Sequence, residues 1–411
     1  MINNFLYIDP GTGSMLFTLA IGIATTSVFA FRALIIKLRF ILSGGKTDKL
    51  NQNRIPYLIF SDSKRYWNVF KPICDEFEAR GLPLVYYTQS ADDPALEEKY
   101  ENVKASYIGE GNKGFVKMNM LNAGIVMSTT PGLDVLQWKR SRNTKFYVHI
   151  PHTVDDLAGY RMFALDHYDA VLTTGSNQEK LIRKIEELRP SIAKKEIVCT
   201  GATFMDRALS HVKNLEKKQN EKKTILLAPS WGPSGILTKF GERLIDSLLK
   251  TGYEIIVRPH PQSVVSEKHI LEPLKEKYKD CVEWNFENDN LAVMNRADLL
   301  ITDFSGIIFD WTLLFNRPFI YADTEMDTSV YDADWLDEKM WVLRTAEKIG
   351  VKLEEKDFDN IKSIIDGALS SSELSQARNE VADECWQNRG NAAVAIVDYI
   401  QKKHKEFEEA K

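Results

Sequence analysis

Residues 299–310 read LLITDFSGIIFD, and this stretch joins two kinds of secondary structure through a polar turn. Its apolar start predicts a buried strand at Leu299–Thr302, and the apolar run after Gly306 predicts a helix. The turn places Asp303 and Ser305 at the carboxyl end of the strand, where open parallel sheets bind ligands. Unpaired N–H groups at the start of the helix favour an anion, so the turn predicts a phosphate site with Gly306 allowing close approach. The simpler interpretation is that Asp303 or Ser305 only caps the helix.

The same alternation of apolar runs and helical stretches extends in both directions. It predicts an α/β protein with two Rossmann-like domains whose parallel sheets face a cleft. The predicted strands are Tyr57–Phe60, Leu84–Tyr87, Ile125–Ser128, Phe146–Ile150, Ala170–Thr173 and Ile197–Thr200, then Thr224–Ala228, Glu254–Val257, Leu299–Thr302 and Phe319–Ala322. The predicted helices are Trp67–Arg80, Asn177–Leu188, Leu237–Thr251, Glu267–Lys279, Gly306–Leu314 and Ser372–Trp386. A charged stretch poor in apolar residues predicts a linker at 213–223, which separates a domain at 51–212 from a domain at 224–411.

The amino-terminal 50 residues have a different pattern. From Pro10 to Phe31 no residue is charged, and the centre of the run is apolar all round, which predicts a helix that crosses a membrane. No basic residue precedes the run, so it does not resemble a secretory signal peptide. Basic residues follow from Arg32 onward, which puts the amino terminus outside and both later domains in the cytoplasm. We therefore expect residues 1–50 to form a single-pass anchor in the inner, cytoplasmic membrane; a buried core helix or an interfacial anchor is the alternative.

Composition excludes several classes of protein. The 411 residues include 53 Lys and Arg against 58 Asp and Glu, a net charge of −5, which argues against binding to nucleic acid. With 44% hydrophobic and 27% charged residues, the chain is not disordered. The four cysteines are scattered singly, so they indicate neither a disulfide framework nor zinc ligands. We expect no cofactor and no tightly bound metal.

A second candidate site follows the predicted strand Glu254–Val257, where the sequence reads Arg258-Pro259-His260-Pro261. The flanking prolines fix the backbone around the histidine and remove backbone donors. An imidazole held beside a permanent cation suits proton transfer or the binding of a phosphate. The plain alternative is a surface histidine in a proline-braced turn.

A third candidate site lies at the end of a first-half strand. His149 and His152 stand three residues apart there, followed by Asp155 and Asp156. The pair resembles a metal site, but no third His or Cys lies at ligand spacing, and the aspartates fit a helix start equally well. We expect a base in the wall of the cleft, with His152 preferred over His149 because it faces a polar turn.

A weaker signal comes from the first loop of the second half, which contains Ser230 and Trp231. The small residues of this loop suit a phosphate or a polyol, and the indole ring suits stacking on a base or a sugar. A simple turn explains the loop equally well.

With these motifs in this order, the chain resembles the CDP-glycerol glycerophosphotransferase family, the teichoic-acid primase and polymerase group. The motifs are the strand end at His149–His152, Ala228–Trp231, Arg258–Pro261 and Thr302–Gly306 followed by Asp310. The resemblance implies a GT-B-like fold whose last helix crosses back to the first domain. It also implies one essential histidine from each domain, which corresponds to His260 and to either His152 or His149.

The resemblance also implies the reaction: transfer of a polyol phosphate from a CDP-activated donor to a hydroxyl of a lipid-linked or polymer acceptor, with release of CMP. Donor binding would then involve Arg258, Asp303, Ser305 and Gly306, with Ser230 and Trp231 in the adjoining loop. Two other functions are compatible with the same residues. One is a GT-B glycosyltransferase or sugar-nucleotide 2-epimerase that uses a UDP- or GDP-sugar, and the other is a non-catalytic, membrane-tethered binding protein.

Overall fold

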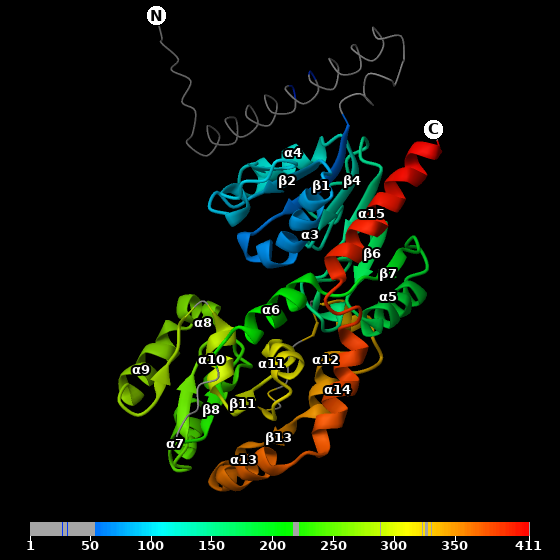
Figure 1. Cartoon of the computed structure of the whole chain (residues 1–411). Coiled ribbons are helices and arrows are strands. Elements are labelled where there is room, and N and C mark those ends of the chain that lie inside the picture. The colour runs from blue at the N-terminus through cyan, green and yellow to red at the C-terminus, as the bar shows by residue number, and fades with distance from the viewer. Residues whose placement is uncertain are drawn as a thin grey trace, which may run out of the picture. The chain divides into compact units, whose positions relative to one another are not determined.

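Two all-parallel sheets form the framework of a computed structural model of the chain (Figure 1). The structure describes Ser27, Phe31 and residues 54–216, 222–287, 289–322, 324, 328–329 and 331–410. Ile55–Lys411 form one compact unit, which is the part discussed below. The predicted membrane anchor at 1–50 lies outside the described residues except for Ser27 and Phe31. Where the structure is described, it contains no helix of the length and apolar character that a membrane crossing requires.

The first sheet has seven strands in the order β3-β2-β1-β4-β5-β6-β7. Each pair of neighbours is parallel; for example, Leu58 is opposite both Val85 and Val126. The chain reverses its direction of travel across the sheet between β1 and β4, which is where such sheets bind ligands. The strands are β1 (Ile55–Ser61), β2 (Leu84–Thr88), β3 (Val103–Tyr107), β4 (Ala123–Ser128), β5 (Phe146–His149), β6 (Ala170–Thr173) and β7 (Glu196–Cys199).

The second sheet repeats this topology with six strands in the order β10-β9-β8-β11-β12-β13. Its reversal lies between β8 and β11, so the loops after these two strands are adjacent. The strands are β8 (Thr224–Leu227), β9 (Glu254–Val257), β10 (Glu283–Trp284), β11 (Leu299–Thr302), β12 (Phe319–Ala322) and β13 (Val351–Leu353).

Helices cover both faces of each sheet, as parallel strands buried on two sides require. The α-helices are α3 (Trp67–Ala79), α4 (Asn112–Asn119), α5 (Ser176–Leu188), α6 (Thr203–Lys213), α7 (Ile236–Leu249), α8 (Pro261–Ser266), α9 (Lys268–Tyr278), α10 (Asn290–Arg296), α11 (Ile307–Phe315), α12 (Trp341–Ile349), α13 (Ile361–Ser370), α14 (Glu373–Cys385) and α15 (Ala392–Glu409). Short 3-10 helices are η1 (Lys64–Tyr66), η2 (Pro94–Leu96), η3 (Leu157–Gly159), η4 (Asp332–Trp335) and η5 (Glu355–Asn360).

The chain crosses back from the second sheet to the first through α14 and α15. Ile396, Val397 and Ile400 of α15 are fully buried in the core that β1, β4 and α3 share, so the last helix completes the first domain (Figure 1). The crossing requires a close approach of two backbones, because a Cβ on Gly175 would lie 2.2 Å from the carbonyl oxygen of Glu384.

The strands that are apolar in sequence were predicted with ends within about two residues of the observed ones, and the predicted α/β class is confirmed. The strands β3, β10 and β13 were not predicted from the sequence. The same holds for the helices α4, α6, α8, α10, α12, α13 and α15 as separate elements. Residues 217–221 of the predicted linker lie outside the described residues, and α6 ends at Lys213.

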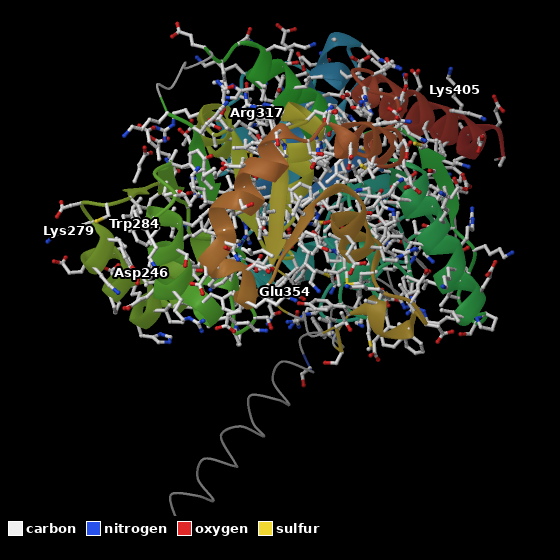
Figure 2. All side chains as sticks on the ribbon, turned by 90° about the horizontal axis from the view of Figure 1, so that it is seen from below. Asp246, Lys279, Trp284, Arg317, Glu354 and Lys405 are labelled. Carbon is white, nitrogen blue, oxygen red and sulfur yellow. The ribbon has the colours of Figure 1, made fainter. Side chains whose placement is uncertain are left out.

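Truncation of one core side chain on α15 should destabilise the protein. We expect Ile396→Ala to lower the free energy of unfolding by about 2–5 kcal/mol, because it leaves a cavity at a fully buried site. Lys405→Ala on the exposed side of the same helix is the matched control and should change stability by less than about 0.5 kcal/mol (Figure 2). Urea denaturation of the full chain measures both, and equal effects would contradict the packing described here.

Candidate active site

The carboxyl end of β5 brings His149 and His152 to one tyrosine. Nε2 of His149 lies 3.3 Å from the hydroxyl of Tyr160, and Nδ1 of His152 lies 3.4 Å from the same oxygen. His149 has no exposed surface, whereas His152 is partly exposed and lines a cavity. Of the two predicted histidines, only His152 therefore reaches a space that a substrate can occupy.

Both of these imidazoles are neutral near pH 7. Burial lowers the pKa of His149 to about 3, and the nearby His152 is a smaller cause. Burial also lowers the pKa of His152 to about 4, with the charge of Arg65 as a further cause. The ring of His152 is held between Tyr66, at a centroid distance of 4.8 Å, and Tyr160, at 5.8 Å.

The cavity beside His152 joins the two domains and has a volume of about 510 Å³. Asp155, Asp156 and Tyr160 line it from the first domain, and Gly306 and Asp310 line it from the start of α11. A Cβ placed on Gly306 would lie 3.8 Å from Oδ2 of Asp155, so the turn before α11 lies close to the wall that the first domain provides. The predicted phosphate turn and the predicted base therefore share one cavity.

Three carboxyl groups of this cavity hold protons unusually well. Burial, with smaller contributions from the neighbouring Asp156 and Asp310, raises the pKa of Asp155 to about 7, although the hydrogen bond from Thr153 lowers it. Burial likewise raises the pKa of Asp156 to about 6 and that of Asp310 to about 6. From the sequence, Asp155 and Asp156 were predicted only to fit the start of a helix. The structure adds Asp155 and Asp310 as polar groups that a hydroxyl-rich substrate would meet.

His260 lies at the carboxyl end of β9, where it caps α8. Its Nδ1 accepts a hydrogen bond from the backbone N–H of Gln262 at 3.0 Å, so the ring hydrogen of the neutral form is on Nε2. Burial lowers its pKa, and Glu267 and Arg65 have smaller and opposite effects. The prolines on both sides hold this orientation, and Nε2–H is left as a donor.

Arg258 has a partner within its own domain. Its guanidinium donates to the side-chain oxygen of Asn285, next to the end of β10. Burial lowers its pKa, and the charges of Glu287 and Asp289 raise it. The structure therefore connects Arg258 to the β10 side of the sheet, and its predicted help to His260 stays a prediction.

Asp303 organises the loops instead of capping α11. Its carboxylate accepts hydrogen bonds from the N–H of Ser230 at 2.9 Å and from the N–H of Ile236 at 2.9 Å. Trp231 follows in the same loop, is 49% exposed, and has its ring centroid 6.4 Å from that of His260. The three second-domain motifs found in the sequence therefore meet at the carboxyl ends of β8, β9 and β11.

Ser305 lies one residue before Gly306, which is the N-cap of α11. Its Oγ accepts a weak hydrogen bond of 3.5 Å from the N–H of Ile307. Gly306 is exposed at this turn, but the N–H groups of Ile308 and Phe309 already donate to the carbonyl oxygens of Ser305 and Gly306. Only the turn itself could therefore hold an anion, and the predicted anion site stays a prediction.

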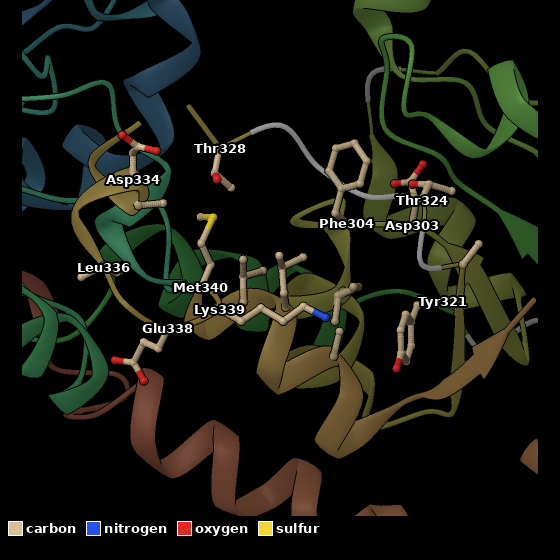
Figure 3. A pocket seen from close by; sticks show the side chains of 16 residues that line it. Asp303, Phe304, Tyr321, Thr324, Thr328, Asp334, Leu336, Glu338, Lys339 and Met340 are labelled. Carbon is tan, nitrogen blue, oxygen red and sulfur yellow. The ribbon is translucent and has the colours of Figure 1, made fainter. Parts of the chain in front are cut away.

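A second cavity of about 490 Å³ adjoins the first, since Phe304, Met340 and Val342 line both. Figure 3 shows Asp303, Phe304 and Thr324 at one side of it, with Asp334 and Glu338 at the other. It lies beyond the carboxyl end of β12, where Tyr321 and Ala322 contribute to the wall.

Arg65 is a cation near the candidate histidines that was not predicted from the sequence. It lies in η1, directly after β1, and its Nε donates to Oγ of Ser63 at 3.3 Å. Burial is the largest cause of the lowered pKa of His152 and of His260, and the positive charge of Arg65 lowers both pKa values further. The guanidinium therefore acts electrostatically on both rings. A signal was available, because a basic residue just after a predicted strand follows the same rule that identified His260.

No group of three or more His, Cys, Asp or Glu side chains is arranged to hold a metal ion in the parts of the chain that the structure describes. The cavity instead offers the neutral imidazole of His152, the turn at Gly306 and carboxyl groups with raised pKa values, whereas His260 lines neither of the two cavities described here. Such a set can position a phosphate and transfer a proton.

Comparison with known proteins identifies relatives of this arrangement. The family model described as CDP-Glycerol:Poly(glycerophosphate) glycerophosphotransferase matches residues 166–402, more than half of the chain. Two solved structures of histidine variants of the wall teichoic acid polymerase TagF are similar, each with a TM-score of 0.55, at 16% and 18% identity. Each match covers 92% of this chain and 98% of the TagF chain, and one of the two was soaked with CDPG.

The UDP-GlcNAc 2-epimerase from Neisseria meningitidis, bound to UDP-GlcNAc, has a TM-score of 0.52 at 13% identity, covering 85% of this chain and 100% of that one. At these identities the solved structures show the fold, which is the predicted GT-B-like arrangement. No curated protein sequence matches the chain.

The raised pKa of Asp155 predicts how its removal changes stability with pH. The folded carboxyl group keeps its proton up to about pH 7, whereas the unfolded group loses it near pH 4, so raising the pH through this window destabilises the folded state. Asp155→Asn should therefore stabilise the protein at pH 8 and give a gain that shrinks toward zero as the pH falls to 4.

His149 and His152, whose pKa values are lowered, change stability in the opposite direction as the pH rises. The stability of the variant is therefore compared with that of the wild type at each pH. Thermal melting from pH 4 to 8 measures the difference. Asp359→Asn, at an exposed position in η5, is the control and should give no pH-dependent gain. A gain for Asp155→Asn that grows toward low pH would show that the carboxylate is stabilised in its charged form.

Proposed function

Because this chain belongs to the CDP-glycerol:poly(glycerophosphate) glycerophosphotransferase family and is a glycerophosphate transferase, we propose how its own site performs the transfer. The proposed donor is a CDP-polyol, with glycerol as the polyol, and the acceptor is a hydroxyl of a lipid-linked or glycopolymer chain. The single observation that carries the proposal is the cavity shared by His152 and the start of α11.

In the proposed reaction, the acceptor oxygen attacks the β-phosphorus of the donor. The bond between this phosphorus and the oxygen of CMP breaks, and CMP leaves as the new phosphodiester forms. Nε2 of His152 takes the proton of the acceptor hydroxyl, a role that typically contributes about 10²–10⁴-fold. The Nε2–H of His260 and the N–H groups of Gly306 and Ile307, in the turn that begins α11, stabilise the charge on the phosphate oxygens.

The two adjoining cavities suggest how the donor is divided. We assign the nucleoside to the 490 Å³ cavity beyond β12 and the transferred polyol phosphate to the 510 Å³ cavity, where Asp155 and Asp310 face its hydroxyls. The diphosphate then lies near Phe304–Gly306, between the two. At this position the protein would accelerate phosphoryl transfer by aligning the reacting atoms and by stabilising charge with fixed dipoles.

We further propose that the chain acts at the inner face of the cytoplasmic membrane, held by residues 1–50. The support is the uncharged run from Pro10 to Phe31 and the basic residues after it. An anchor would confine the enzyme and a lipid-linked acceptor to one surface, which raises their effective concentration.

The proposed donor is tested by CMP release from labelled CDP-glycerol in membranes that carry the full chain. His152→Ala and His260→Ala should each lower the rate by about 100-fold or more, since each removes a proton carrier or a charge-stabilising donor. His269→Ala, at an exposed histidine of α9, is the matched control and should keep the wild-type rate. Near-normal CMP release by both cleft variants would refute the assignment.

A panel of nucleotides separates this proposal from a UDP- or GDP-sugar enzyme. CMP and CDP-glycerol should raise the melting temperature of the full chain more than UDP or GDP at equal concentration. Larger protection by UDP or GDP would favour the sugar-nucleotide alternative, and tolerance of the histidine substitutions in cells would favour a binding protein.

Arg65 should strengthen donor binding from the first domain. Its charge lowers the pKa of both His152 and His260, the two histidines of the proposed reaction, and a hydrogen bond to a charged group such as the diphosphate contributes about 1.5–3 kcal/mol. Arg65→Gln should therefore raise the KM for CDP-glycerol roughly tenfold. Lys64→Gln is the control, because Lys64 pairs with Asp92, and it should leave the KM unchanged. Equal effects of the two substitutions would indicate a general loss of positive charge.

A further inference from the structure

The hydroxyl of Tyr160 connects two histidines that differ completely in exposure. It lies 3.3 Å from Nε2 of the buried His149 and 3.4 Å from Nδ1 of the cavity-lining His152. A tyrosine hydroxyl has one hydrogen, so it can donate to only one of these nitrogens. The other ring must then donate its own hydrogen to the oxygen.

Each of the two rings is neutral near pH 7 and therefore carries a single ring hydrogen. This leaves two coupled arrangements. In one, Tyr160 donates to His149, His152 donates from Nδ1, and Nε2 of His152 is bare. In the other, Tyr160 donates to His152, and Nε2 of His152 carries the hydrogen.

The chemistry of the proposed function, on which this inference rests, requires the first arrangement, because only a bare Nε2 can accept a proton. We infer that Tyr160 is a positioning residue: it accepts the Nδ1 hydrogen of His152, gives its own hydrogen to His149, and so keeps Nε2 of His152 free as the base. The rings of Tyr66 and Tyr160 fix the plane of the imidazole, and the hydroxyl fixes its tautomer.

His149 then has a role that its full burial does not suggest. It never meets the substrate, and it serves as the acceptor that turns the hydrogen of Tyr160 away from His152. Its Nδ1 has no hydrogen-bond partner among the described residues. In this arrangement Nδ1 of His149 carries a buried hydrogen without a partner, which costs stability. The functional reason for this cost is that the tautomer of His149 keeps His152 in the base form.

Nitrogen-15 NMR of the histidine side chains tests the tautomer directly, with the full chain and no substrate. The resonances of His152 are assigned by their loss in His152→Gln. We expect His152 to show a protonated Nδ1 and a bare Nε2 in the wild type, and a mixture of tautomers in Tyr160→Phe. A wild-type His152 with its hydrogen on Nε2 would overturn the inference.

Kinetics gives a second test with a closely matched control. Tyr168 also packs against His149, with ring centroids 5.0 Å apart, but its hydroxyl donates to the carbonyl of Thr130. Tyr160→Phe should lower kcat by at least about tenfold with the KM for CDP-glycerol nearly unchanged, as is typical when a supporting hydrogen bond to a functional histidine is lost. Tyr168→Phe should leave both values within about twofold. Equal losses in both variants would show that only packing matters.

Single and double variants test whether His149 and Tyr160 act through the same hydrogen bond. His149→Leu removes the acceptor, so Tyr160 is free to donate to His152, and kcat should fall; His149→Gln, which keeps an acceptor, should recover part of the loss. The double variant His149→Leu with Tyr160→Phe should be no slower than the slower single variant, because both act through one hydrogen bond. Independent, multiplying losses would contradict the coupling. Absence of CMP release from the wild type would count against the proposed function alone, since the NMR test needs no turnover.

Discussion

The buried carboxylate of Asp303 is the contact on which the second-domain half of the site depends. It is 1% exposed, so its charge is costly, and burial raises its pKa while the N–H groups of Ile236 and Ser230 lower it. Through these donors it ties the end of β11 to the loop after β8 and to the start of α7. That loop places Trp231 next to His260, and the turn after Asp303 places Phe304 and Gly306 in the wall of the cavity. One carboxylate therefore fixes several segments that are far apart in the chain.

A second set of buried polar contacts fixes the position of one wall of the cavity relative to the other. Asp156, next to the cavity, accepts a hydrogen bond from the N–H of Val342 at 3.2 Å. Asp332 accepts one from the N–H of Phe163 at 3.1 Å and pairs with Arg189 at 3.4 Å. These contacts join the segment that carries His152 and Tyr160 to the segment that lines the second cavity. The alignment of base and phosphate site therefore depends on buried aspartates that accept hydrogen bonds from backbone N–H groups, which hold a geometry better than loose side-chain packing does.

The sequence predicts the parts of the fold and site that depend on local patterns. Central strands such as Leu299–Thr302 are apolar throughout and were found, whereas β3 is mostly exposed, β10 has two residues and β13 has three, so none forms an apolar run. Short motifs next to strand ends led to His152, His260 and the turn at Asp303. Partners that are distant in sequence cannot be identified in this way, and for that reason the hydrogen bonds from Ser230 and Ile236 to Asp303 were not predicted. Tyr160 was missed because it follows no strand, and its contacts arise only when the turn after β5 folds back.

The path of the last helix has a consequence for how the protein is made. The ribosome delivers β1–β7 first, yet the apolar surface of that sheet is covered in part by Ile396, Val397 and Ile400, which emerge only after the whole second sheet. Until translation is nearly complete, the first domain therefore exposes apolar surface to solvent. A nascent chain in this condition is a natural client for chaperones, and its first half reaches its native state only near the end of translation.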